Sequence, residues 1–465
     1  MTPSEIDNIL KYIASEKPRL EHNNDVLCIL EGELLKFVEA HFRSEFTEAD
    51  SVNQVLPRIS PINFLSRITD KLSKIYQTGV KRTIIDGNDQ DTELIRWYEN
   101  VMQIDAVMNV GNEYFNTFKT NLNQLFISKR LPKLRSIPND RFLVYSDNQE
   151  DPTVPTHVIM PMGSRLVKDS RTNKTKNVDE FVIWTDEEAV IVDSDGDQRP
   201  FFDSGETKNP LGLDVFMYVN KSRFFLMPPM DTDTKRMTVL LAVLLSDLNY
   251  AAKFQSFSIM YGIDVNDEGL KMKPNSFWTF KSDSGTDKPP QLGQLTPQAQ
   301  IQQILQLVAT ELGMWLNSRN IRPGSIGNLT SDNMSSGISK IVDEADTSDE
   351  RKKQVEFYKA AEEEWWNGLM HNIHPQWVAQ GLIDQTMLFS QNARISVEFP
   401  PQIPLQSRGD LVRDLMAEVE AGFLSRDTAM LKLNPDWGET ELEAEKEKIG
   451  EQFEVISDGG EVEEN

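Results

Sequence analysis

The sequence predicts an α+β protein that is predominantly helical. Long stretches repeat apolar residues at spacings of three and four, most clearly at 231–254, 296–317 and 335–370, which is the period of an amphipathic helix. Short runs of β-branched and aromatic residues lie between residues 138 and 219, and polar turns separate them. Helices followed by a small antiparallel sheet are typical of an α+β domain.

Length and cysteine content set the next limits. A chain of 465 residues is long enough for about two to four domains and a sizeable core. Its single cysteine, Cys28, excludes an internal disulfide and indicates a reducing compartment such as a cytoplasm. Cys28 lies in the apolar run 26–30, so we expect a buried small hydrophobe rather than a nucleophile.

The net charge of −25, from 73 acidic and 48 basic residues, is the most informative global property. Proteins that grip nucleic acid by neutralising phosphates carry a basic excess. The charge therefore argues against a repressor or a helicase-like protein, but it is compatible with a protein past which DNA slides without being held. The sequence has no run of about 18 apolar residues and no secretory signal, so we expect no membrane segment.

The N-terminal half is expected to begin with helices and to continue into the sheet. Residues 1–53 are helical and polar in pattern, and residues 62–76 predict an amphipathic helix that Gly79 stops. Two more helices are predicted at 92–108 and 110–128. The predicted strands are 142–145, 156–160, 180–184, 189–192 and 214–219.

Residues 231–254 form the most apolar of the predicted helices. One face carries Met237, Leu240, Leu241, Leu244, Leu248 and Ala251. Val239, Val243 and Leu245 widen that face, so we expect this helix to be buried in a core or against neighbouring subunits. A compact insert over 257–292 follows, with strand-like runs at 258–261 and 277–280.

A second helix and a glycine-rich break come next. Thr296 is a suitable N-cap and Pro297 a suitable first residue for the helix at 296–317. The break at 318–329 contains one proline and two glycines, so no helix runs through it.

The C-terminal part is predicted to be mainly helical. A long helix over 334–370 carries Trp365 and Trp366 on different sides, so at least one of them is expected to contact another domain or subunit. A strand at 394–399, a helix at 410–421 and a further helix capped by Ser425 follow. The segment 436–465 has twelve acidic residues against two lysines and is expected to be frayed or disordered after Phe453.

The sequence holds no motif that specifies catalysis. The phosphate-binding P-loop and the Gly-x-Ser-x-Gly nucleophile motif are both absent, so we expect neither an enzyme nor a cofactor. Residues 193–197 contain three aspartates, but Gln198 and Ser204 occupy the positions where a calcium loop needs glycine and an acid. A polar hairpin turn is therefore favoured there.

Two further polar clusters have alternative readings. His371 and His374 are three residues apart, and a solvated helix end is favoured over a metal site because no other ligand motif surrounds them. Glu362, Glu363 and Glu364 are favoured as a solvated helix face over a catalytic pair. No metal site is expected.

The order of these elements resembles the portal proteins of tailed bacteriophages. The local stretches that carry the resemblance are Asn-Pro-Leu-Gly at 209–212, Asn-Met-Ser-Ser-Gly-Ile-Ser-Lys at 333–340, Glu-Phe-Pro-Pro at 398–401, Ala-Gly-Phe-Leu-Ser-Arg-Asp-Thr-Ala-Met at 421–430 and the acidic segment 434–445. With the order of elements included, the resemblance covers residues 62–447. Ser339, Lys340 and Asp427 depart from the family pattern, which leaves the subfamily open.

The resemblance implies a ring, usually of twelve subunits, at one vertex of the capsid, through which double-stranded DNA is packaged and ejected. It implies a wing over 1–230, stem helices over 231–255 and 296–317, and a clip over 256–295 that meets terminase and later the head–tail adaptor. A tunnel loop over 318–334, a long wing helix with a closing strand over 335–403, and a helical crown with an acidic tail over 404–465 complete the subunit. The implied location is the virion, next to the major capsid protein, after assembly in the host cytoplasm.

Within that architecture, the expected DNA-tunnel residues are Arg319, Arg322, Gly324, Gly327 and Asn328. The ring would bring the two arginines to the passing phosphates, which they would touch without reading sequence. Pairing of these arginines with neighbouring carboxylates is the alternative. The acidic surface would repel DNA and let it move with low friction.

The expected subunit contacts are Leu240, Leu244, Leu248, Trp365 and Trp366. Two other functions stay open. One is an acidic oligomeric interaction scaffold without a DNA role, and the other is a hydrolase whose active-site residues are dispersed in the sequence.

Overall fold

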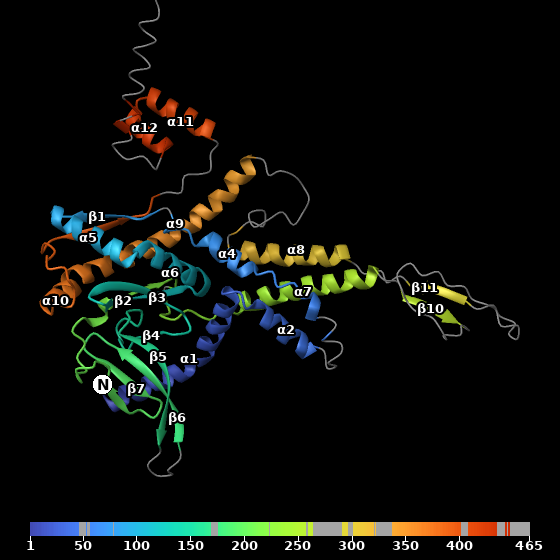
Figure 1. Ribbon diagram of the computed structural model, residues 1–465, viewed down its shortest axis with the longest axis horizontal. Helices are drawn as coiled ribbons and strands as arrows, with labels where there is room; N and C mark the ends of the chain where they lie inside the picture. The colour runs from blue at the N-terminus through green and yellow to red at the C-terminus, as the bar shows by residue number, and fades with distance from the viewer. Residues whose placement is uncertain are drawn as a thin grey trace, which may run out of the picture. The chain divides into compact units, whose positions relative to one another are not determined.

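The computed structural model describes residues 1–45, 53, 56–77, 79–168, 175–222, 224–256, 259–263, 291–295, 301–319, 321, 337–400, 408–434, 442–443 and 445–446. These residues form a mixture of helices and antiparallel sheets (Figure 1), as the α+β prediction requires. The chain divides into two compact units, Met1–Pro400 and Pro401–Asn465.

The first unit begins with two helices, α1 (Pro3–Leu30) and α2 (Leu34–Glu45). Thr2 caps α1 in a capping box with Glu5, which satisfies N–H groups that the first turn leaves free. The buried apolar residues of α1 fall into two groups, because Ile6, Ile9 and Ile13 join one hydrophobic core, whereas Val26 and Ile29 join another.

Three more helices precede strand β2 in the sequence: α4 (Phe64–Leu72), α5 (Asp89–Met102) and α6 (Ile104–Phe118). The short 3₁₀ helix η1 spans Leu56–Arg58. Gln103 has a φ of 50° and separates α5 from α6, and Lys119 has a φ of 67° and ends α6. Gln103 therefore interrupts the helix predicted over 92–108, and Lys119 interrupts the helix predicted over 110–128.

The prediction of a helix over 110–128 is wrong for residues 120–128. They form β2 (Thr120–Ser128), which pairs on one side with β3 (Leu131–Ile137) and on the other with β9 (Phe216–Asn220). A strand with a partner on each side saturates its backbone hydrogen bonds, and this long-range pairing outweighs the local helical pattern.

The other predicted strands are present, in a second antiparallel sheet of order β4-β5-β6-β7-β8. Its members are β4 (Leu143–Tyr145), β5 (His157–Lys168), β6 (Thr175–Trp184), β7 (Ala189–Asp193) and β8 (Gln198–Pro200). The short 3₁₀ helix η2 (Gly212–Val215) leads into β9. A separate pair joins β1 (Lys81–Ile85) to β12 (Arg394–Glu398).

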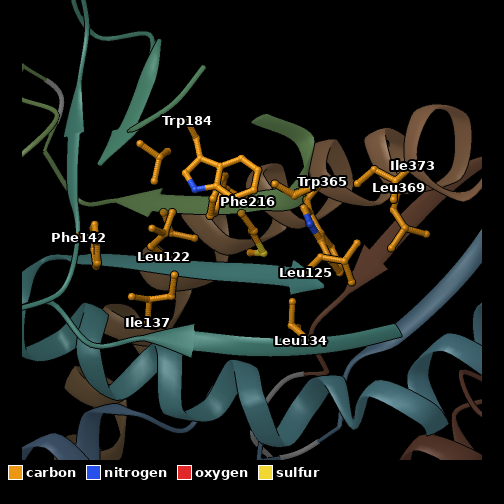
Figure 2. Close-up of a cluster of buried hydrophobic side chains, with 14 of the residues drawn as sticks. Leu122, Leu125, Leu134, Ile137, Phe142, Trp184, Phe216, Trp365, Leu369 and Ile373 are labelled. Carbon is orange, nitrogen blue, oxygen red and sulfur yellow. The ribbon is translucent and has the colours of Figure 1, made fainter. Parts of the chain in front are cut away.

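The larger hydrophobic core lies between these sheets and the helix α9 (Gly337–Gly368) with its continuation (Figure 2). The continuation is the π-helical turn η4 (Leu369–Ile373) and the helix α10 (His374–Ala379). Trp184 and Phe216 meet with their ring centroids 5.5 Å apart in a T-shaped contact. In Figure 2, Trp365, Leu369 and Ile373 extend into the same core from the helix.

A second core lies under the helices α7 (Thr232–Ser256) and α8 (Ile301–Ser318). The two helices lie side by side in Figure 1 and contact each other. In sequence they flank β10 (Ile259–Ile263) and β11 (Gln291–Leu295), which pair antiparallel. Among the described residues, no helix is long and apolar enough to cross a membrane.

The second unit contains α11 (Arg408–Glu420) and α12 (Arg426–Leu433), which contact each other. Ser425 caps α12, as predicted, by accepting a hydrogen bond from the N–H of Thr428.

Candidate functional site

The helices α7 and α8 contain most of the residues predicted as stem helices, and the candidate site lies on them. In the middle of α7, Leu241, Ala242 and Val243 are all buried, although consecutive helical residues point about 100° apart. The helix is therefore covered on several sides there, as its apolar composition predicted. Leu240, Leu244 and Leu248, the predicted subunit contacts on this helix, are half-buried within one chain.

The helix α8 buries one face and exposes apolar residues on another. Val308, Leu312, Trp315 and Leu316 are buried against the core. Leu307 is 46% exposed and Met314 58% exposed, and a separation of seven residues places them on one side of the helix. We call Leu307 and Met314 the outer α8 face. An amphipathic helix that packs on a core by one side carries polar residues at such positions.

An ion-paired clamp joins the start of α7 to the end of α8. Arg319 Nη2 lies 2.8 Å from Asp231 Oδ2 and donates a second hydrogen bond to Thr234 Oγ1. Lys119 Nζ is 3.6 Å from the same Asp231 oxygen. Burial alone would raise the pKa of Asp231, but Arg319 and Lys119 lower it below its ordinary value.

A cleft of about 430 Å³ opens beside this clamp. Its cationic side chains are Lys119, Lys221 and Arg319, and its acidic side chains are Asp231, Asp233 and Glu350. Lys221 Nζ lies 2.5 Å from Glu350 Oε1, so this cleft contains ion pairs rather than a patch of uncompensated positive charge. Such a lining gives an anion little net attraction.

Of the five predicted tunnel residues, only Arg319 lies in the part of the chain that the structure describes. Arg319 forms an ion pair with Asp231. Pairing with a neighbouring carboxylate was the alternative to a contact with DNA. Arg322, Gly324, Gly327 and Asn328 lie outside the described residues.

The two tryptophans predicted at a subunit interface are core residues of a single chain. Trp365 is 4% exposed and Trp366 is fully buried, and their rings meet in a T-shaped contact. Consecutive helical positions do face different sides, as expected, but both sides are covered by the chain's own sheets and helices. The prediction that Trp365 and Trp366 offer a surface to a neighbour is therefore wrong.

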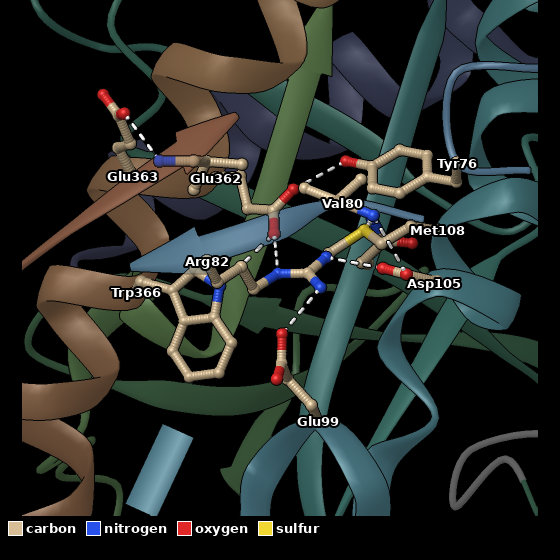
Figure 3. Close-up of polar contacts among 11 residues, drawn as sticks. Tyr76, Val80, Arg82, Glu99, Asp105, Met108, Glu362, Glu363 and Trp366 are labelled. Carbon is tan, nitrogen blue, oxygen red and sulfur yellow. Dashed lines mark hydrogen bonds and ion pairs between the residues drawn. The ribbon is translucent and has the colours of Figure 1, made fainter. Parts of the chain in front are cut away.

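A buried charge cluster, invisible in the sequence, joins α9 to β1, α5 and α6 within the first unit (Figure 3). The Arg82 side chain is 2% exposed and donates to Glu362 at 2.6 Å, to Asp105 at 2.8 Å and to Glu99 at 3.0 Å. Glu362 also accepts from the Tyr76 hydroxyl at 2.8 Å and from Trp366 Nε1 at 3.3 Å. Glu362 thus belongs to the core, and its prediction as part of a solvated face is wrong.

The electrostatics of this cluster follow from burial and pairing. Burial alone would lower the pKa of Arg82, but Glu362 and Asp105 raise it well above its ordinary value. Burial raises the pKa of Glu99, against the opposing effect of Arg82. The Arg82 guanidinium is held by three carboxylates from α5, α6 and α9 and is almost fully buried. A substrate therefore has no access to it, and the arrangement is structural.

The remaining sequence candidates are also structural. Asp193 Oδ1 accepts hydrogen bonds from the N–H groups of Asp195 and Asp197 between β7 and β8, which is the favoured polar turn. His374, favoured as part of a solvated helix end, is fully buried: its Nε2 donates to the Met387 carbonyl, so Nδ1 accepts from the Tyr98 hydroxyl. Cys28 is only half-buried rather than buried. In the part of the chain that the structure describes, no three His, Cys, Asp or Glu side chains gather as a metal site requires.

No protein-family model and no curated protein matches this chain. The chain aligns with chains of solved gene transfer agent (GTA) particles. One is in the neck of an empty GTA particle computed with C6 symmetry, at 11% identity and a TM-score of 0.40, with 83% of this chain and 94% of that chain covered.

Two further alignments have the same identity of 11% and the same TM-score of 0.40. One, to the virion of the native GTA particle, covers 85% of this chain and 98% of that chain. The other, to the neck of the native particle computed with C12 symmetry, covers 80% and 89%.

Proposed function

We propose that this chain is the subunit of a portal-type ring at a capsid vertex, through which double-stranded DNA passes during packaging and ejection. The observation that carries the proposal is the outer α8 face. Leu307 and Met314 are exposed on a helix whose other side is already buried against α7 and the core, and a second surface would remove this apolar area from water.

A ring of identical chains supplies that surface. In a head-to-tail ring, each copy meets its neighbour through two different surfaces, and the contact closes without further components. The half-buried Leu240, Leu244 and Leu248 of α7 are the proposed counterpart of the outer α8 face. The proposed number of subunits is twelve.

The charge of the chain suits a conduit better than a DNA-binding protein. A net charge of −25 would keep a polyanion from adhering to the walls of a channel. The segment 318–334 begins at the last residue of α8 and is proposed to line the channel, with Arg322, Gly324, Gly327 and Asn328 as its DNA-facing residues. The insert between α7 and α8 is the proposed docking site for terminase and then for the head–tail adaptor, and the major capsid protein is the proposed partner of the wing.

One observation favours the second candidate, an acidic oligomeric scaffold without a DNA role. Arg319 is held by Asp231 and Thr234, so one of the two arginines proposed to meet DNA already has partners. An Arg322→Ala variant separates the two functions. Reduced DNA packaging with intact rings supports the conduit, and unchanged packaging supports the scaffold.

The proposal is tested by the mass of the purified full-length chain in solution, measured by mass photometry and imaged by negative-stain microscopy. We expect closed rings with an axial channel. A Leu307→Glu, Met314→Glu double variant should remain monomeric, because it places two charges in the proposed contact. Gln302→Glu, on another exposed side of α8, is the control and should assemble normally. A wild-type chain that stays monomeric at all concentrations would refute the proposal.

A further inference from the structure

Two phenylalanines project from the loop that connects β9 to α7. Phe224 is 80% exposed and Phe225 is 57% exposed. Burial of apolar side chains stabilises a protein in proportion to the area removed from water, so two adjacent exposed rings represent a large unused stabilisation. We call Phe224 and Phe225 the phenylalanine knob.

The backbone under the knob is fixed by side chains. Asn220 Nδ2 donates to the carbonyl oxygens of Phe225 at 2.7 Å and of Leu226 at 2.9 Å. Ser222 Oγ accepts from the N–H groups of Phe224 at 3.3 Å and of Phe225 at 3.1 Å. The backbone that carries the knob is therefore held in place before the knob meets any partner, which lowers the entropy cost of binding.

The far end of the loop is anchored as well. The Tyr218 hydroxyl donates to the Leu226 carbonyl, and Arg19 on α1 donates to the Pro228 carbonyl. Met227 and Pro228 are buried. The loop thus turns its apolar residues both ways, with Met227 in the core and the knob in solvent.

We propose that the phenylalanine knob is an anchor that inserts into the adjacent copy of this chain in the assembled ring. This inference rests on the proposed ring. A fully buried aromatic side chain removes about 150–250 Å² from water. At 80% and 57% exposure, the two rings of the knob can still supply roughly 200–340 Å², while a stable interface needs about 800 Å² from each partner.

The small area of the knob therefore indicates which partner it contacts. A separate partner would not be held by these two rings alone. A neighbouring copy, already held through α7 and α8, needs only an additional well-packed aromatic anchor, and interfaces concentrate their energy in such anchors. The loop runs directly into α7, so the knob and the proposed helix contact belong to one continuous stretch of chain.

The experiment compares full-length chains by mass photometry over a concentration series. In a Phe224→Ser, Phe225→Ser double variant, the concentration for half-assembly should rise at least about tenfold relative to the wild type. Leu166→Ser is the matched control, since Leu166 is 71% exposed on β5, and it should assemble like the wild type. Circular dichroism melting should be the same for all three chains, because the altered side chains contact little of their own fold.

A crosslinking arm identifies the partner. The photoreactive residue benzoylphenylalanine replaces Phe224, and labelled and unlabelled chains (¹⁵N and ¹⁴N) are mixed, assembled and irradiated. Crosslinked peptides that combine both isotopes are expected. If the wild type forms rings but the double variant assembles at the same concentration, or if only same-chain crosslinks form, the knob inference is wrong and the ring stands. If the wild type never assembles, the ring proposal itself fails, and the knob inference with it.

Discussion

Arg319, at the end of α8, and Asp231, just before α7, form an ion pair of 2.8 Å that ties the two helix ends together. Both side chains are more than four-fifths buried, at 17% and 19% exposure. The pair also holds the backbone at the point where the glycine-rich segment begins. Any contact of Arg319 with DNA would therefore have to compete with Asp231.

A double-mutant cycle tests the strength of this clamp. Arg319→Ala, Asp231→Ala and the double variant should give a coupling free energy of about 1–2 kcal/mol in chemical denaturation, since the pair is largely desolvated and hydrogen-bonded. The exposed pair Lys11–Asp7, at 71% and 63% exposure, is the control, and its coupling should be about 0–0.5 kcal/mol. Equal coupling in both pairs would show that the clamp contributes nothing specific.

Removal of Glu362 should destabilise the first unit strongly. Glu362→Ala deprives Arg82, Tyr76 and Trp366 of a shared acceptor in the core, and loss of one partner from a buried ion pair costs about 3–5 kcal/mol. Glu364→Ala, two residues later on an exposed side of α9, should change the unfolding free energy by less than about 0.5 kcal/mol. The two variants are compared by denaturant unfolding, and similar midpoints would contradict a structural role for the Arg82 cluster.

Stability should decrease on mild acidification because of His374. Burial lowers the pKa of His374, and the hydrogen bond to the Met387 carbonyl offsets this only in part. The unfolded chain then takes up its proton near pH 6.5, while the folded chain does so only at lower pH. The unfolded state binds more protons in that window, so the unfolding free energy falls as pH drops below about 6.5.

The measurement is the melting temperature between pH 7.5 and pH 5.5. His374→Gln keeps an acceptor for the Tyr98 hydroxyl and should show a smaller decrease than the wild type. Some decrease should remain, because burial also lowers the pKa of His157. An unchanged pH dependence in His374→Gln would rule out this histidine as the cause.

Trp365→Ala should act on folding rather than on assembly. Trp365 is 4% exposed in the larger core, and truncation of a buried tryptophan costs about 3–5 kcal/mol. Leu166→Ala, at an exposed position, should leave the melting temperature nearly unchanged. If Trp365→Ala melts like the wild type but fails to assemble, the original prediction of a subunit contact would be restored.

Sequence patterns located α7, α9, β4, β7 and β9 to within about three residues of their bounds. They also located α8, β5 and β6, but β5 ends eight residues later and β6 begins five residues earlier than predicted. They succeeded because each element carries its own period: three to four residues for a helix that packs by one face, and short β-branched runs between turns for the strands. The failure over 120–128 has the opposite cause. There the neighbours in β3 and β9 decide the conformation, and β9 is some ninety residues away in sequence.

The candidate site divides in the same way. The apolar surplus of α7, the acidic charge and the position of the glycine-rich segment are properties of the sequence alone, because composition and local spacing are sufficient to state them. Only the tertiary structure decided that Trp365, Trp366 and Glu362 are core residues, that Arg319 is paired with Asp231, and that Leu307, Met314 and the phenylalanine knob remain exposed. Burial and pairing depend on contacts between segments far apart in the chain, and no local pattern encodes which face of an apolar helix those contacts will cover.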